Sequence, residues 1–134
     1  MRILVTICLF TASVFSLNIQ AQNKPLNKQQ TLDYIESVYK QAYSYKDNKL
    51  TNISLDGNIL KLSFNNGNND NCNLFTPEPL KVGLKNNGYN VYFSEQIVIL
   101  YCIQTETDAK RLKKALEHLI EILKTENNTD PFGE

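Results

Sequence analysis

Few side chains in this chain could do acid–base or nucleophilic chemistry. His118 is the only histidine, and spacing assembles no Ser–His–Asp or Cys–His set around it. Glu78, Glu95, Glu106 and Asp108 lie near predicted turns, where paired carboxylates could act as general acid and base. Acids are also common at turns for solvation reasons alone. The chain has no glycine-rich phosphate loop, zinc-ligand spacing or nucleophile elbow, so we expect no cofactor, no metal site and no enzyme activity.

Two cysteines of the predicted domain, Cys72 and Cys102, could form a disulfide in an oxidising compartment. The bond would close a loop of about 30 residues and contribute roughly 3–4 kcal/mol if unstrained. Alternatively, Cys102 is a small buried hydrophobe in the strand Ile97–Ile103, and Cys72 is free. The sequence leaves both readings open, because a bond needs Cα atoms within about 7 Å of each other.

Asparagine is concentrated between Asn65 and Asn73, where the sequence reads NNGNNDNCN. Asn and Gly tolerate left-handed backbone conformations and favour turns, so we expect a long exposed loop. Its side-chain oxygens are of a type that binds calcium, but their spacing does not match an EF-hand, which closes on a Glu. The prediction is therefore a solvated loop rather than a metal site.

Tyrosine is concentrated in the first predicted helix. Tyr39 and Tyr43 belong to its apolar stripe, whereas Tyr34 and Tyr45 project with Val38 to one side. This wider apolar arc could pack against the C-terminal helix. It could also form a contact surface, since tyrosine suits interfaces that are apolar at one end and wet at the other. Tyr34, Val38 and Tyr45 are therefore candidate contact residues.

The N-terminal 21 residues have the order of a secretory signal peptide. Arg2 supplies a positive charge, Ile3–Leu17 is almost uncharged and apolar, and Ala21 offers a small residue at a cleavage point. A retained membrane anchor is the alternative, but the apolar run is shorter than the roughly 20 residues that span a bilayer. Cys8 lies inside this run rather than at its end, which disfavours a lipoprotein. We expect cleavage near Ala21 and a periplasmic or secreted protein.

The size and the charge of the chain exclude some classes of function. The predicted organisation is a signal peptide at 1–21, a leader at 22–27, one domain at 28–124 and a flexible tail at 125–134. The chain has 14 basic and 14 acidic residues, and loss of Arg2 with the signal leaves 13 against 14. Phosphate binding requires a basic surface, so we expect no nucleic-acid partner. The sequence after the signal peptide contains no second long apolar segment, so we expect no membrane span after processing.

Two helices are predicted to bracket the domain. The first covers about Lys28–Tyr45, with Asn27 as the N-cap of a capping box. The second covers about Asp108–Lys124, with Thr105 or Thr107 as its N-cap. The second helix has a broad apolar face at helical spacing, formed by Leu112, Ala115, Leu116, Leu119, Ile120 and Leu123.

Between these helices the apolar residues alternate with polar ones, which is the period of a strand. Asp56-Gly57 and Asn87-Gly88 each lie between such runs and predict two hairpins. The run Ile97–Ile103 is apolar on both faces, which predicts a central, covered strand. The predicted class is α+β: an N-terminal helix, an antiparallel meander sheet of five to six strands and a C-terminal amphipathic helix.

Three stretches, TNISLDGNILKLSF, IVILYCIQ and DAKRLKKALEHLIEIL, carry a resemblance to known proteins. Their order is similar to that of small exported Bacteroidota proteins of unknown function. Strands followed by one amphipathic helix resemble PH-like domains, and a helix before the strands resembles a cystatin-like arrangement. The resemblance covers about Thr51–Lys124. It implies a helix packed across a curved meander and transfers no functional residue.

Together these features favour a monomeric or weakly associating, exported, non-catalytic binding module whose partner is a protein or a small ligand. Two other classes stay open: a small envelope hydrolase or transferase that uses loop carboxylates, and a structural component of the envelope. A deep pocket with two or more convergent acids would favour the enzyme. A large exposed aromatic patch would favour a binding partner over a structural role.

Overall fold

The computed structural model describes residues 24–128, so the predicted signal peptide, Cys8 and the tail from residue 129 lie outside the described residues. The described chain begins with helix α2, Lys28–Ala42, and ends with helix α3, Glu106–Asn128. Between them run the strands β1 (Leu50–Asp56), β2 (Ile59–Phe64), β3 (Asn69–Asn73), β4 (Lys81–Lys85), β5 (Gly88–Ser94) and β6 (Ile97–Ile103). The predicted α+β class is confirmed, and so are the two hairpins. Their turns are each shifted by one residue from the predicted pairs, to Gly57-Asn58 and Asn86-Asn87.

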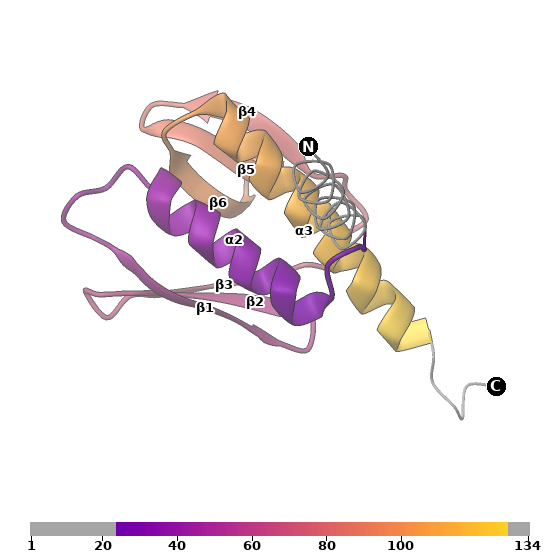
Figure 1. Ribbon diagram of the computed structural model, residues 1–134. Helices are drawn as coiled ribbons and strands as arrows, with labels where there is room; N and C mark the ends of the chain where they lie inside the picture. The colour runs from indigo at the N-terminus through magenta and orange to yellow at the C-terminus, as the bar shows by residue number, and fades with distance from the viewer. Residues whose placement is uncertain (1–23, 129–134) are drawn as a thin grey trace, which may run out of the picture.

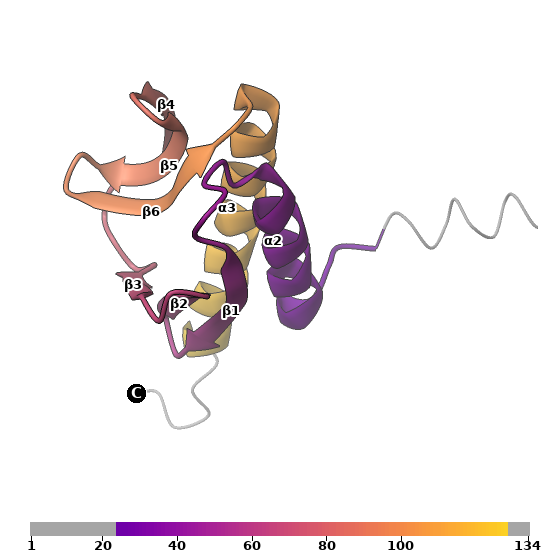
Figure 2. The same ribbon diagram turned by 90° about the vertical axis from the view of Figure 1, so that its left-hand side faces the viewer.

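The strands form two antiparallel sheets of three, in the orders β1-β2-β3 and β4-β5-β6, rather than one meander sheet. The ribbon in Figure 2 shows both sheets curving around one side of the helix pair. β3 and β6 contact each other across the division, where the Tyr101 hydroxyl donates to Asp70 Oδ2 at 2.8 Å. No backbone ladder joins these two strands.

The outer edge of β6 is occupied by α2 and the segment after it. The Tyr39 hydroxyl donates to the Tyr101 carbonyl at 3.0 Å and accepts from the Tyr101 N–H at 3.3 Å. The Ser44 N–H donates to the Cys102 carbonyl at 2.8 Å, and Tyr43 forms a bridge with Ile103. The outward backbone groups of Tyr101 and Cys102, in the C-terminal part of β6, are therefore already bonded. β6 is accordingly an edge strand, and the prediction that it is central was wrong.

The Asn-rich segment is only partly the loop that was predicted. Asn69–Asn73 pairs with β2 as strand β3, and the turn before it includes Gly67 in the left-handed region at φ 86°. Pairing with β2 satisfies backbone groups on one side of this polar segment, while most of its side chains face solvent.

The two helices lie side by side and antiparallel (Figure 1). At one end Lys28 Nζ lies 2.8 Å from Glu126 Oε2, and at the other the Gln104 N–H donates to the Ala42 carbonyl at 2.9 Å. None of the described helices is both long and apolar enough to cross a bilayer.

The helix ends follow from local chemistry. The capping box at Asn27 is confirmed, because its side chain accepts from the Gln30 N–H at 2.9 Å and the Gln30 side chain bonds back. α2 ends at Ala42 rather than at the predicted Tyr45, because Tyr43 adopts an extended backbone with ψ 124°. At α3 the Thr105 hydroxyl accepts from the Asp108 N–H at 3.2 Å, as an N-cap does. This helix continues to Asn128, so the first residues of the predicted tail are helical.

The core lies between the helix pair and the inner faces of the strands. α2 contributes the stripe with Ile35 and Tyr39, both fully buried. The predicted apolar face of α3 supplies the other wall, since Leu112, Leu116 and Leu119 have no exposed surface. Both sheets therefore share a single core, although no ladder connects them.

Candidate functional site

The acids considered for catalysis are dispersed in the fold. Glu78 is exposed between β3 and β4, and Glu95 lies in the β5–β6 turn, 3.9 Å from Lys85 Nζ. Glu106 pairs with a lysine one turn along α3, and Asp108 accepts from the Thr105 hydroxyl at 2.9 Å. None of these four acids lines any of the most pronounced hollows of the described surface, which have volumes of about 340–480 Å³.

His118 has a structural contact instead of an acid–base partner. Its Nε2 lies 2.8 Å from the Leu26 carbonyl, which can only accept, so the ring N–H donates there. Within residues 24–128 no group of three or more His, Cys, Asp or Glu side chains is placed to hold a metal ion. Asp70, the acid of the Asn-rich segment, accepts from the Tyr101 hydroxyl.

No disulfide joins Cys72 and Cys102, and both thiols are free in the structure. Cys102 is buried in the core, which matches the alternative of a small hydrophobe in a strand. Cys72 is half-buried on β3, opposite Leu60 of β2. Burial raises the pKa of each thiol above its usual value, which keeps both sulfurs protonated and slow to react.

The thiols can be counted directly. We expect Cys72 and Cys102 each to take up one alkylating group when the protein is unfolded without reductant, because neither sulfur is bonded. Peptide mapping by mass spectrometry measures this. A peptide pair linked through Cys72 and Cys102 would show instead that the two strands can be bridged.

The predicted tyrosine surface is not continuous. Tyr34 and Tyr45 are 38% and 48% exposed, whereas Val38 packs partly against the core. Because α2 ends at Ala42, Tyr45 lies on the segment beyond the helix and not on the helical stripe that contains Tyr34. The structure therefore separates Tyr45 from the other two candidate residues.

Tyr45 is instead the outer member of an aromatic stack. Tyr43 lies at its centre, with ring centroids 5.4 Å from Tyr39, 5.9 Å from Tyr45, 5.7 Å from Phe64 and 5.9 Å from Tyr101. Tyr39 is fully buried and Tyr45 is half exposed, so the stack leads from the core to the surface. Such ring pairs prefer tilted and edge contacts, which hold each ring in a defined orientation.

A hollow of about 480 Å³ lies beside this stack, where α2 ends and the chain turns toward β1. Lys40 pairs with Glu36. In the described part of the chain no ion pair involves Lys46 or Lys49. The wall contains no acid; it is formed by Lys40, Tyr43, Ser44, Tyr45, Lys46, Lys49, Leu50 and Gln104. Burial raises the pKa of the Tyr43 hydroxyl, so the ring stays neutral and the lysines set the charge of the hollow.

The β4–β5 turn holds one side of the hollow. The Ser44 hydroxyl donates to the Asn87 carbonyl at 3.3 Å, and the Asn87 amide donates to the Tyr45 hydroxyl at 3.3 Å. These contacts tie the segment after α2 to a hairpin more than 40 residues away. The position of the Tyr45 ring therefore depends on tertiary contacts and not on a helix.

Two irregular features are connected to the wall of this hollow through neighbouring residues: Asn48 precedes Lys49, and the Cys102 carbonyl accepts from the Ser44 N–H. Asn48 Oδ1 is a buried acceptor with no hydrogen-bond partner among the described residues. Such groups are rare in folded proteins, because burial removes their hydrogen bonds to water and nothing replaces them. Cys102 has a left-handed backbone at φ 57°, which is costly for a residue with a Cβ. It lies in a β-bulge opposite Asn90, whose Oδ1 accepts from the Cys102 N–H at 3.2 Å. Departures of this kind are concentrated at functional sites.

Sequence reasoning identified Tyr45 but missed the lysines around it. The available signal was the interleaving of aromatic and basic residues in Tyr43–Lys49. Comparison of the chain with protein families, with curated proteins and with solved structures gave no match in any of the three. The resemblance to small exported Bacteroidota proteins and to PH-like or cystatin-like domains therefore stays a prediction.

Proposed function

We propose that this protein is a small exported, non-catalytic binding module, and that the hollow beside Tyr45 binds an acidic saccharide. The observation that carries the proposal is the presence of an exposed aromatic ring and three lysines around one hollow with no acid in its wall. The signal-peptide pattern supports export, where polymers with carboxylated sugars are accessible ligands.

The chemistry of the wall matches such a ligand at two points. The Tyr45 ring offers a flat apolar face for the C–H groups of a sugar ring, and its neighbour Tyr43 fixes its tilt at a centroid distance of 5.9 Å. Lys46 and Lys49 can then donate charge-assisted hydrogen bonds to a carboxylate. Neutral donors and acceptors on Ser44 and Gln104 complete the wall.

Replacing Tyr45 with alanine should weaken binding of a galacturonate oligomer by about three- to tenfold, the value of one aromatic contact. Tyr45→Phe should keep most of the affinity, because the ring face is retained. Tyr34→Ala is the matched control: its ring is 38% exposed but lies on α2, away from the hollow, so binding should not change. Isothermal titration calorimetry on the full-length protein measures each affinity.

A second pair of substitutions tests the contribution of the lysine charges to binding. Lys46→Gln with Lys49→Gln should weaken binding of the acidic oligomer and reduce its dependence on salt, since screening acts on exposed charges. The neutral galactose oligomer should bind weakly to every variant. Saturable binding that is the same for both oligomers would contradict a role for the lysines. No saturable binding to either would favour a structural component, and cleavage of an oligomer would favour the hydrolase.

A further inference from the structure

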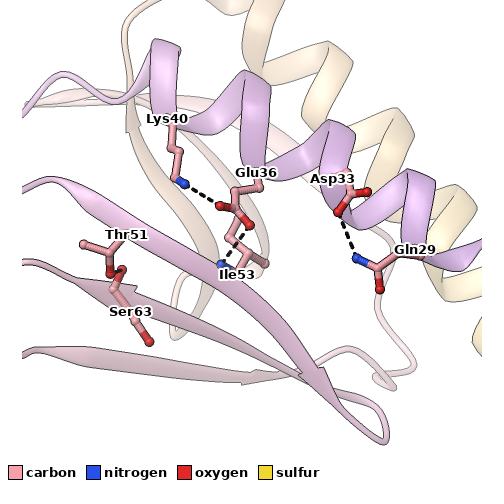
Figure 3. Close-up of polar contacts among 7 residues, drawn as sticks. All are labelled: Gln29, Asp33, Glu36, Lys40, Thr51, Ile53 and Ser63. Atoms are coloured by element: carbon pink, nitrogen blue, oxygen red, sulfur yellow. Dashed lines mark hydrogen bonds and ion pairs between the residues drawn. The ribbon is translucent and has the colours of Figure 1, made fainter.

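The outer strands of the two sheets differ in whether their outward backbone groups have hydrogen-bond partners. Figure 3 shows Glu36 of α2 reaching the backbone of β1, where its Oε2 accepts from the Ile53 N–H at 3.3 Å. On β6 the C-terminal part of the outer edge, at Tyr101 and Cys102, is bonded by Tyr39 and Ser44. β4 is the outer strand of its sheet, and in the described part of the chain only β5 pairs with it.

The hairpin register identifies which groups of β4 point outward. Lys85 pairs with Gly88 across a two-residue turn, and such a closing pair is hydrogen-bonded. Hydrogen-bonded pairs alternate with non-bonded ones, so the N–H and C=O groups of Val82 and Leu84 face away from β5. The same rule applied to β1 places the Ile53 N–H outward, which is the group that Glu36 accepts from.

A groove runs beside this edge. Val82 packs partly on the core and forms the apolar side of a hollow of about 420 Å³, whose other residues, on α3, are Lys110, Lys113, Lys114 and Glu117. Leu84, two residues along the same face of β4, is 68% exposed, the most exposed large apolar side chain described.

This groove is positively charged although the whole chain has a formal net charge of zero. Lys110 and Lys113 pair with Glu106 and Glu117 at 2.8 Å, and no ion pair among the described residues involves Lys114. Lys81 and Lys85 lie at the two ends of β4, on the face opposite to that of Val82 and Leu84, with Lys85 at 3.9 Å from Glu95. Bases therefore outnumber acids along the groove.

From these observations we infer that the free edge of β4 accepts an extended acidic segment of a partner protein as an added strand. The backbone of the segment pairs with Val82 and Leu84, and its carboxylates face Lys110, Lys113 and Lys114. Strand addition supplies affinity through main-chain hydrogen bonds, and alternate side chains supply specificity. This site is distinct from the hollow beside Tyr45, because none of the same residues lines both.

A second copy of the chain fits this edge poorly. Antiparallel pairing of two β4 strands through Val82 and Leu84 centres on Gly83. It would place Lys81 of each strand opposite Lys85 of the other, and like charges directly opposite each other are destabilising. The charge pattern thus favours an acidic segment over self-association.

The test uses the full-length protein and three blocked heptapeptides. In the first, Glu alternates with Val; in the second, Lys replaces Glu; the third is the first with alternate backbone nitrogens methylated. Nuclear magnetic resonance titration should show saturable amide shifts at Val82 and Leu84 with the first peptide only. Methylation removes the N–H donors of a strand but keeps the charge, so it separates strand addition from simple ionic attraction.

Lys110→Gln combined with Lys114→Gln should weaken binding of the acidic peptide by about three- to tenfold, as expected for two partly exposed charge contacts. Lys124→Gln, an exposed lysine near the other end of α3, is the control and should bind normally. Equal binding of the methylated and unmethylated acidic peptides would overturn the inference, as would no shift at Val82 and Leu84. Shifts there that depend on protein concentration without peptide would assign the edge to self-association instead.

Discussion

Leu116→Asp should leave the protein largely unfolded at moderate temperature. Leu116 has no exposed surface and lies on the face of α3 that closes the core. Removing a buried leucine costs about 2–5 kcal/mol, and an unpaired carboxylate in an apolar interior costs several kcal/mol more. A small domain is stable by about 5–15 kcal/mol, so most of its stability would be lost. Urea unfolding followed by circular dichroism measures the change.

Leu84→Asp is the matched control, because the same substitution is made at a side chain that is 68% exposed. We expect its free energy of unfolding to stay within about 0.5 kcal/mol of the parent value. If Leu116→Asp unfolded at the same urea concentration as the parent, α3 would not be docked against the strands in solution.

Gly88→Ala should destabilise the protein by roughly 2–4 kcal/mol, through backbone strain combined with a steric clash. Gly88 has φ +129°, a region that residues with a Cβ rarely adopt. A Cβ added there would lie 2.7 Å from the Ile103 carbonyl oxygen, which belongs to the backbone of β6 and cannot rotate away. The β5–β6 pairing would have to shift. The midpoint of urea unfolding reports the loss.

Gly57→Ala separates the two causes. Gly57 also has a positive φ, +59°, but a Cβ there would meet no atom within 4 Å. The Gly57→Ala variant should therefore lose only about 1–2 kcal/mol of unfolding free energy, which is the cost of placing a residue with a Cβ in the left-handed conformation. Equal losses for the two variants would mean that the close approach to Ile103 does not occur in solution.

Local features of this fold could be predicted because they depend on residues close in sequence. The capping box joins Asn27 to Gln30, three positions on. The two-residue turn after Asp56 follows from Asp-Gly between alternating apolar residues. The apolar face of α3 follows from its spacing, and burial of Leu112, Leu116 and Leu119 confirms it. In each case one short segment contains both partners of the interaction.

Contacts between distant segments decided the rest. The Tyr39 hydroxyl bonds Tyr101, 62 residues away, and the Ser44 N–H bonds the Cys102 carbonyl. These bonds occupy the C-terminal part of the outer edge of β6, and this strand, which is apolar on both faces, is the last strand of its sheet. Its burial comes from the core beneath it and not from a strand on each side.

The candidate site divides in the same way. Tyr43, Tyr45, Lys46 and Lys49 are neighbours in sequence, so an aromatic and basic segment was visible from the residues alone. Their arrangement around a hollow could not be predicted, because Gln104 and Asn87, which contact them, come from much later in the chain. Sequence pattern determines which side chains a segment carries. Only tertiary packing decides which of these side chains line the same hollow, because the hollow is formed by contacts between segments that are distant in sequence.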